Sequence, residues 1–190
     1  MVQTHNGRLQ ETVNEQGTVT GDGISGPATL DPIDILMKEH EEGMSDLGII
    51  SQAAKSIQVD GFSARAFQEM ATAVRAIADL ISRHNNAEET LLFPLLERHT
   101  NAMPGTIMIE HREVTRTFRE LLRSINDIEE GRIHGSSIRE LLQLANFVVS
   151  HLGNHMTKEN TVLFPLAKRL LTNEEYEKLR LGIARSSAQA

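Results

Sequence analysis

With 190 residues, 39% of them apolar, the chain is long enough for one substantial core, and no apolar run approaches the roughly 20 residues that cross a bilayer, so we expect no membrane partner. The net charge of −7, without any Lys/Arg-rich stretch, argues against nucleic acid as a partner. The absence of cysteine excludes disulfides, thiolate zinc sites and cysteine-ligated iron–sulfur clusters, so any metal must be bound by nitrogen and oxygen atoms.

The first 30 residues are rich in Gly, Thr, Asn and Gln and have no apolar periodicity, which predicts a flexible N-terminal arm over 1–30. The N-terminus shows no basic segment followed by an apolar one, so we expect no secretory signal and a cytoplasmic protein. Asp31 and Pro32 then indicate the start of a helix, because an N-cap acid is followed by a proline at the first helical position.

Four long segments then carry apolar residues at three- and four-residue spacings, which is the pattern of amphipathic helices. Short breaks rich in Gly, Pro and Ser separate them. Because short connections favour antiparallel neighbours, the sequence predicts an all-α fold, an up-down-up-down four-helix bundle over 31–185. The four segments cover about 32–57, 63–99, 104–130 and 137–171.

Local signals refine these boundaries. Ser137 with Glu140 has the spacing of a capping box and predicts the start of the fourth helix. Thr172 with Glu175 has the same spacing and predicts a short C-terminal helix over about 173–184. Pro94 and Pro165 fall inside the second and fourth segments, where a proline removes a backbone hydrogen bond and should bend the helix.

The chain repeats itself with an offset of 71 residues. A Met-x-Glu-His-x-Glu segment occurs at 37–42 and at 108–113, and a His-x-x-x-Glu segment that runs into Leu-Phe-Pro-Leu occurs at 84–95 and at 155–166. The first and third helices therefore correspond, as do the second and fourth. This correspondence predicts a pseudo-twofold axis through the bundle.

The repeated segments carry the candidate metal ligands. A histidine and a glutamate four positions apart lie on one face of a helix and can bind one metal ion together. A lone pair of this kind is usually a surface ion pair, but two copies in register, each running into apolar sequence, favour metal binding. With one further histidine from each of the other two helices, the donors suffice for two metal ions bridged by carboxylates. Such donors suit iron, manganese or zinc. The six candidates are His40, His84, Glu88, His111, His155 and Glu159.

Neighbouring residues have weaker claims on the site. His151 lies one turn before His155 and could line the pocket or orient a ligand. His99 lies near a helix end, where solvent exposure and the helix dipole explain it better. Met44 and Thr115 lie four positions after His40 and His111, so we expect both to face the metals without binding them strongly.

The doubled motif resembles the hemerythrin HHE cation-binding family, in the Glu-His pair that opens each half and the His-x-x-x-Glu run that closes it, over about 31–185. The resemblance implies two non-haem iron ions bridged by carboxylates and by an oxo or hydroxo group, with the same six residues as ligands. Oxygen-carrying hemerythrins place two histidines four apart on the third helix, whereas this chain has Thr115 at the second position.

From this resemblance we expect a di-iron protein that binds or reacts with a small oxidant (O₂, NO or peroxide) for sensing, scavenging or protection. Two alternatives stay open: a peroxidase or NO-detoxifying enzyme at the same irons, and iron storage or donation to iron–sulfur cluster repair. Whether the protein is an enzyme is undecided at this point. Turnover would require an electron donor, for which the sequence shows no motif.

Overall fold

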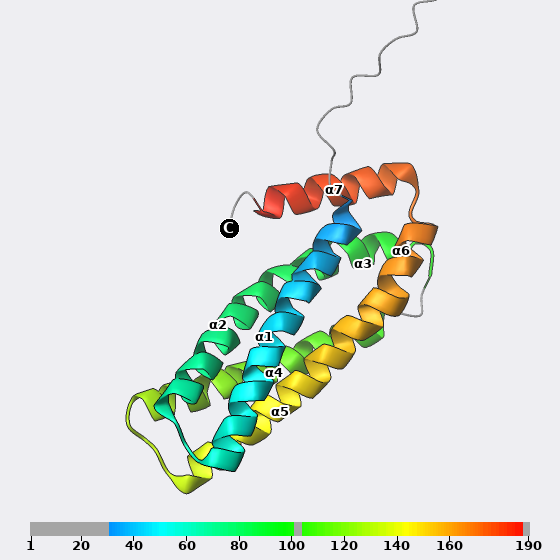
Figure 1. Ribbon diagram of the computed structural model, residues 1–190. Helices are drawn as coiled ribbons and strands as arrows, with labels where there is room; N and C mark the ends of the chain where they lie inside the picture. The colour runs from blue at the N-terminus through cyan, green and yellow to red at the C-terminus, as the bar shows by residue number, and fades with distance from the viewer. Residues whose placement is uncertain (1–30, 101–103, 188–190) are drawn as a thin grey trace, which may run out of the picture.

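The computed structural model describes residues 31–100 and 104–187, and all secondary structure in these ranges is helical. The all-α class predicted from the sequence is therefore confirmed. The predicted flexible arm, residues 1–30, lies outside the described residues. Figure 1 shows long helices packed into an elongated bundle, with α7 lying across one end.

Each predicted segment corresponds to helical structure. α1 contacts α2 and α5, and α4 also contacts α2 and α5, so these four helices surround a common interior in the order α1, α2, α4, α5. The second and fourth segments are each divided, because a short π-helical turn separates the long helix from a short one. The elements are α1 Pro32–Asp60, α2 Ala64–Ala87, η1 Glu88–Leu92, α3 Phe93–Leu96, α4 Pro104–Glu129, α5 Gly135–Lys158, η2 Glu159–Leu163, α6 Phe164–Leu170 and α7 Asn173–Ser187.

Side chains cap α1 and α7 as predicted. The Asp31 carboxylate accepts hydrogen bonds from the backbone N–H groups of Ile33, at 2.8 Å, and Asp34, at 3.4 Å. At the start of α7, the Glu175 carboxylate accepts from the Thr172 N–H at 3.0 Å, and the Thr172 hydroxyl accepts from the Glu175 N–H at 3.3 Å. This reciprocal pair is the predicted capping box.

The capping box predicted for Ser137 and Glu140 is wrong. α5 begins at Gly135, with His134 as its N-cap residue and no side-chain hydrogen bond at the cap. The Ser137 hydroxyl instead donates to the carbonyl of Arg132 at 3.4 Å. Because the backbone becomes helical before Ser137, this residue lies inside the first turn rather than in the extended conformation of an N-cap.

π-helical turns begin at both of the candidate glutamates, just before the two prolines. The backbone N–H of Phe93 donates to the carbonyl of Glu88, and that of Phe164 donates to the carbonyl of Glu159, five residues back in each case. The hydroxyls of Thr90 in η1 and its repeat counterpart in η2 bond to carbonyls one turn earlier, at 2.6 and 2.7 Å. The sequence predicted a bend at each proline and did not predict π-helical turns.

The buried apolar side chains form two clusters along the bundle axis. The larger one fills the body of the bundle and includes Met70, Ile77 and Leu121. The smaller one lies at the end covered by α7 and includes Phe93 and Phe164. On α1, α2 and α4, the candidate histidine falls between residues of the two clusters. After His155 of α5, the smaller cluster begins at Leu163 in η2. A polar layer is thus enclosed by apolar side chains on both sides along the axis.

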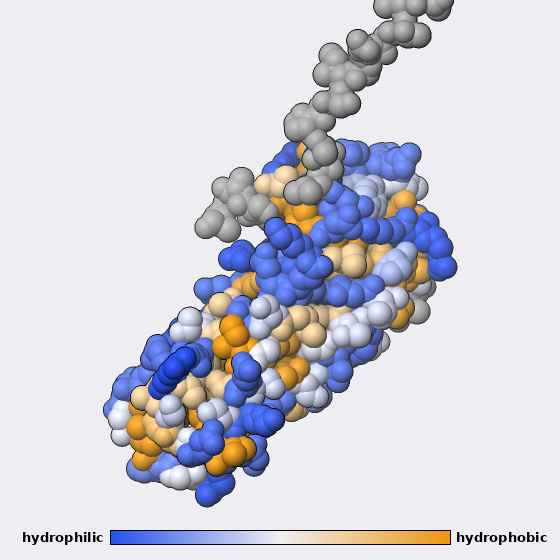
Figure 2. All heavy atoms as spheres, viewed as in Figure 1, coloured by the Kyte–Doolittle hydropathy of each residue, from blue (hydrophilic) through white to orange (hydrophobic). Residues whose placement is uncertain are grey.

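The outside of the bundle is mixed in character. Figure 2 shows hydrophilic side chains over most of one face, with smaller hydrophobic patches between them. Among the described residues, no helix combines the length and the apolar character that crossing a lipid bilayer requires.

Candidate metal centre

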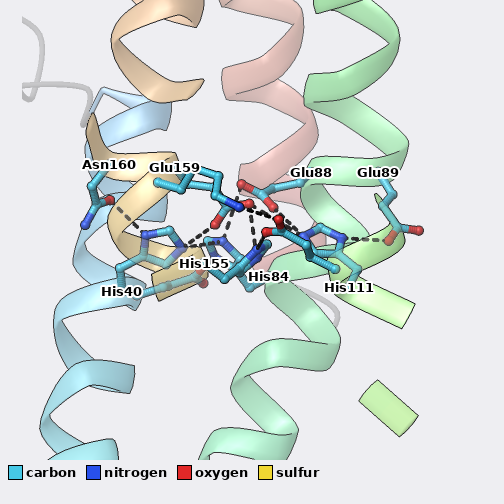
Figure 3. Close-up of polar contacts among 11 residues, drawn as sticks. His40, His84, Glu88, Glu89, His111, His155, Glu159 and Asn160 are labelled. Carbon is cyan, nitrogen blue, oxygen red and sulfur yellow. Dashed lines mark hydrogen bonds and ion pairs between the residues drawn. The ribbon is translucent and has the colours of Figure 1, made fainter. Parts of the chain in front are cut away.

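The polar layer brings together all six candidate residues, which come from α1, α2 with η1, α4, and α5 with η2. Figure 3 shows their side chains converging in the interior of the bundle. Each histidine is at most 4% exposed and both glutamates are 0% exposed. Because isolated charges are costly to bury, such a layer requires internal compensation. The six are His40, His84, Glu88, His111, His155 and Glu159.

Two groups of donors within this layer are close enough to hold metal ions. His40, His84 and Glu159 form one group, and His111, His155 and Glu159 form the other. In the first group, the Nε2 atoms of His40 and His84 are 2.9 Å apart. The His40 Nε2 atom is 3.2 Å from Oε2 of Glu159, and the His155 Nε2 atom is 3.2 Å from Oε1 of Glu159. One carboxylate therefore faces both groups, with a different oxygen toward each.

Glu88 also faces both groups. Its Oε1 atom is 3.5 Å from Nε2 of His84, and its Oε2 atom is 3.2 Å from Nε2 of His111. The His111 Nε2 atom is 3.6 Å from Oε1 of Glu159 as well. Both carboxylates thus lie between histidines of the two groups, which is the position that a bridging ligand requires.

Several of these atoms have no hydrogen-bond partner among the described residues. These buried, unpaired atoms are both carboxylate oxygens of Glu88, both carboxylate oxygens of Glu159, and Nε2 of His111. A buried polar atom without a partner costs roughly 1–3 kcal/mol, and more if it is charged. Oxygen and imidazole nitrogen are also the donor types that first-row transition metals accept. Bound cations would satisfy these atoms, so the residues fit the metal centre that the sequence implied.

The other ring nitrogen of each histidine is held from outside the layer. Nδ1 of His84 lies 2.8 Å from a Glu39 carboxylate oxygen, and Nδ1 of His155 lies 3.0 Å from one of Glu110. Glu39 and Glu110 occupy equivalent positions in the 71-residue repeat. A carboxylate can only accept, so it fixes the proton on Nδ1 and leaves Nε2 to face the interior.

The Nδ1 atoms of His111 and His40 also have partners outside the layer, a carboxylate for His111 and an amide for His40. Nδ1 of His111 lies 2.7 Å from the Glu89 carboxylate, and Nδ1 of His40 lies 2.8 Å from the amide oxygen of Asn160. Glu89 and Asn160 are also repeat counterparts, and Figure 3 shows each one at the outer edge of the layer. Both residues fall within the repeated segments 84–95 and 155–166, but no role was predicted for them. Their recurrence at the 71-residue offset was the signal that could have found them.

Mutual compensation sets the pKa values in the layer. Burial by itself lowers the pKa of His84, but the carboxylates of Glu88 and Glu39 outweigh it and raise that pKa to about 10. Burial also lowers the pKa of His111, but the nearby carboxylates of Glu159 and Glu88 outweigh burial and raise that pKa to about 10. Burial raises the pKa of Glu88, yet His84 and His111 hold it well below its usual range. The carboxylates thus favour positive charge between them, which protons or metal cations can supply.

Comparison with known families agrees with this geometry. The family model described as the hemerythrin HHE cation binding domain matches residues 31–167. The chain belongs to this family. No curated protein matches the chain. The resemblance that the sequence analysis drew from the doubled motif is therefore confirmed, and the two donor groups of this hemerythrin HHE domain could each hold a metal cation.

The remaining sequence candidates lie outside the polar layer of this hemerythrin HHE domain. His151 is exposed and stacks on Phe147, with ring centroids 3.7 Å apart. His99 is exposed, as expected, and its Nε2 atom pairs with the Glu175 carboxylate at 2.8 Å. Met44 was expected to face the metals, but it is 46% exposed. Thr115 lines a cleft between α2 and α4 rather than joining either donor group.

Proposed function

We propose that this hemerythrin HHE protein holds two iron ions in the polar layer and that the iron pair binds or reacts with a small oxidant: O₂, NO or peroxide. The observation that carries the proposal is the place of Glu159, whose two oxygens lie 3.2 Å from Nε2 atoms in different donor groups. A carboxylate in that place is suited to hold two cations next to each other. The hemerythrin HHE match supports iron as the metal.

In this proposal, each half of the repeat contributes equally to the centre. His40 and His84 would hold one ion, His111 and His155 the other, and the two glutamates would be shared, with the additional oxo or hydroxo bridge that the family resemblance implied. The repeat also supports the proposed up-down-up-down course and pseudo-twofold axis, because the Nδ1 contacts of His84 and His155 are equivalent at the 71-residue offset.

An iron pair, when bound, supplies open coordination positions and reducing electrons for a small oxidant. The chain's own residues would prepare the site for it. The partners of Nδ1 hold each imidazole with Nε2 inward, and the apolar clusters on both sides limit access of water along the bundle axis. Thr115 adds no imidazole beside His111, so the donor set stays at four histidines and two glutamates. The expected cytoplasmic location belongs to the same proposal.

The metal part of the proposal is tested by elemental analysis of the full chain after iron-replete expression. We expect about two iron ions per chain, as the paired donor groups require. Less than about one transition-metal ion per chain, with no gain on reconstitution, would contradict it. The His84→Ala variant should lose metal, whereas the control variant His99→Ala should keep it, because His99 pairs with Glu175 away from the layer.

The reactivity part is tested by anaerobic reduction followed by exposure to O₂, NO or H₂O₂, with optical spectra and product analysis. An optical change that reverses when the gas is removed supports reversible binding. Repeated consumption of peroxide with an added electron donor supports an enzyme, and loss of iron to an acceptor supports donation. An iron-loaded protein that responds to none of the three oxidants would contradict the proposal.

A further inference from the structure

A cleft of about 490 Å³ lies between α2 and α4 and reaches the edge of the polar layer. Its lining includes His111 of that layer and Glu89, which accepts the hydrogen bond from Nδ1 of His111. The volume falls within the range of small-molecule sites in proteins, roughly 300–1,000 Å³. The cleft is therefore large enough for an organic molecule and not only for a diatomic gas.

The lining is polar next to the layer and more apolar farther out, where Ser82 and Arg119 are its polar members. α2 and α4 both lead away from the polar layer, and at the far end Arg75 of α2 pairs with Glu129 of α4 at 2.6 Å. A molecule in the cleft would meet hydrogen-bonding groups near the layer and apolar surface farther out. The polar part includes Asn85, Arg112 and Thr115, and the apolar part includes Ile81, Phe118 and Leu122.

Two arginines give the cleft positive charge. Arg112 and Arg119 both line it, and seven positions on a helix place them about two turns, or roughly 10 Å, apart along one face of α4. Neither forms an ion pair with another residue within 31–100 or 104–187. Glu89 carries the opposite charge, but its Oε1 atom already accepts a hydrogen bond from His111. In a chain of net charge −7, unpaired guanidinium groups beside apolar surface favour an anion.

The corresponding groove between α1 and α5 carries methionines instead. In the 71-residue repeat, Met44 occupies the position equivalent to Thr115, and Met156 the position equivalent to Asn85. Met156 packs so closely against α1 that a Cβ atom at Gly43 would lie 2.6 Å from its Cε atom. The space between α2 and α4 therefore results from small polar residues at two positions, not from the bundle architecture alone.

The charges of the two grooves differ as well. The positions of Arg112 and Arg119 correspond to Glu41 and Gly48 in the other half of the repeat. One groove thus has an acid and a glycine where the other has two guanidinium groups. At these repeat positions, the pair of guanidinium groups belongs to the α2–α4 side.

We propose that the cleft between α2 and α4 binds a small organic anion with an apolar body, of the carboxylate or sulfonate class. The body packs against the apolar part of the cleft, and the anionic group pairs with Arg112 at the polar end, while Arg119 adds positive charge farther along α4. Asn85 and Thr115 supply further hydrogen bonds at the polar end. A ligand bound in this way lies next to the hydrogen bond between Glu89 and His111, and so next to the His111 edge of the metal centre.

The test uses two fluorescent probes that share one aromatic frame. 8-Anilinonaphthalene-1-sulfonate carries an anionic group, and N-phenyl-1-naphthylamine lacks it. Both are titrated into the full chain. We expect the double variant Arg112→Gln/Arg119→Gln to raise the Kd of the sulfonate by about tenfold, the usual size of a lost charge-assisted contact, and to leave the Kd of the uncharged probe within about twofold.

The matched control is Arg116→Gln/Arg123→Gln, which removes the same charge from α4 at positions that do not line this cleft. It should leave both Kd values within about twofold, because long-range charge effects are screened. A second variant, Asn85→Met/Thr115→Met, introduces the methionines of the opposite groove and should weaken both probes.

Three results would overturn the proposal: unchanged sulfonate affinity in the cleft-arginine variant, equal weakening in the control variant, or equal weakening of both probes on loss of the cleft arginines. The arginine variants change exposed side chains, so they decide the matter even if the methionine variant fails to fold. The test reads probe binding through Arg112 and Arg119, which belong to neither donor group, so its outcome is separate from that of the iron assay.

Discussion

The carboxylate of Glu89 lies 2.7 Å from Nδ1 of His111, on the edge of the ring that faces away from the polar layer. The equivalent place beside His40 is taken by the amide of Asn160 at 2.8 Å. A carboxylate partner makes an imidazole a more basic ligand than an amide partner does. The two donor groups are therefore alike in their histidines and glutamates but differ in the charge that supports one histidine.

This difference predicts that Glu89→Gln weakens metal binding. The amide keeps a hydrogen-bond acceptor and removes the charge, so we expect a loss of about 10–100-fold in affinity at the position that includes His111. Competition with a chelator of known affinity measures the change. Glu97→Gln is the matched control, because Glu97 is an exposed acid that follows α3, away from the donor groups. An affinity that is unchanged in the Glu89 variant would show that this hydrogen bond does not support a metal ligand.

The place of Glu159 in both donor groups predicts that Glu159→Gln lowers metal content more than His84→Ala does. The first change removes an anionic ligand that both positions share, whereas the second removes a donor from one position. Elemental analysis per folded chain measures this order. His151→Ala should leave the content as in the wild type, because His151 is exposed and stacks on Phe147. The reverse order of the first two variants would argue against a shared carboxylate.

The stability of the metal-free protein should fall as the pH rises from about 6.5 to about 10. The pKa values of His84 and His111 are raised to about 10 in the fold, from the usual 6.5. Their protonated forms therefore contribute stability that is fully present below pH 6.5 and is lost as the pH rises through the folded pKa. Thermal unfolding followed by circular dichroism after chelation measures this trend. A melting temperature that rises over that interval would contradict it.

The metal-loaded protein should respond in the opposite sense. The same imidazoles must be deprotonated to bind a cation, so acidification makes protons compete with the metal, and binding releases protons. We expect the stabilisation that metal provides to shrink as the pH falls below neutrality. Melting temperatures with and without saturating metal, measured at the same pH values, give the difference directly. A difference that grows on acidification would count against histidine ligation.

The hydroxyl of Tyr176 ties α7 to the first turn of α1, because it donates to the Asp31 carboxylate at 2.6 Å. Asp31 is the N-cap of α1 and also accepts from Ile33. We expect Tyr176→Phe to lower the free energy of unfolding by about 1 kcal/mol, which lowers the melting temperature by roughly 2–4 °C for a chain of this size. Chemical denaturation measures the first quantity and calorimetry the second. Unfolding identical to that of the wild type would mean that α7 is held by its apolar contacts alone.

The helices could largely be predicted from the sequence because their signals are local. The periodicity of apolar residues, the cap at Asp31 and the capping box of Thr172 with Glu175 act within one or two turns of the chain. The failure at Ser137 has the opposite cause. Several nearby residues can serve as N-cap, and the path of the preceding turn selects among them. The π-helical turns at Glu88 and Glu159 also went unpredicted, since periodicity alone does not distinguish them from α-helix.

The sequence by itself determined the helical class, the family and the six residues of the polar layer, because the 71-residue repeat marks those residues without knowledge of distance. Tertiary structure alone decided which atoms meet. That Glu159 faces both donor groups, that Glu89 holds His111, and that a cationic cleft opens between α2 and α4 depend on contacts between different helices. These contacts depend on how side chains pack between helices. A repeat in the sequence shows which residues correspond but does not show how their side chains pack.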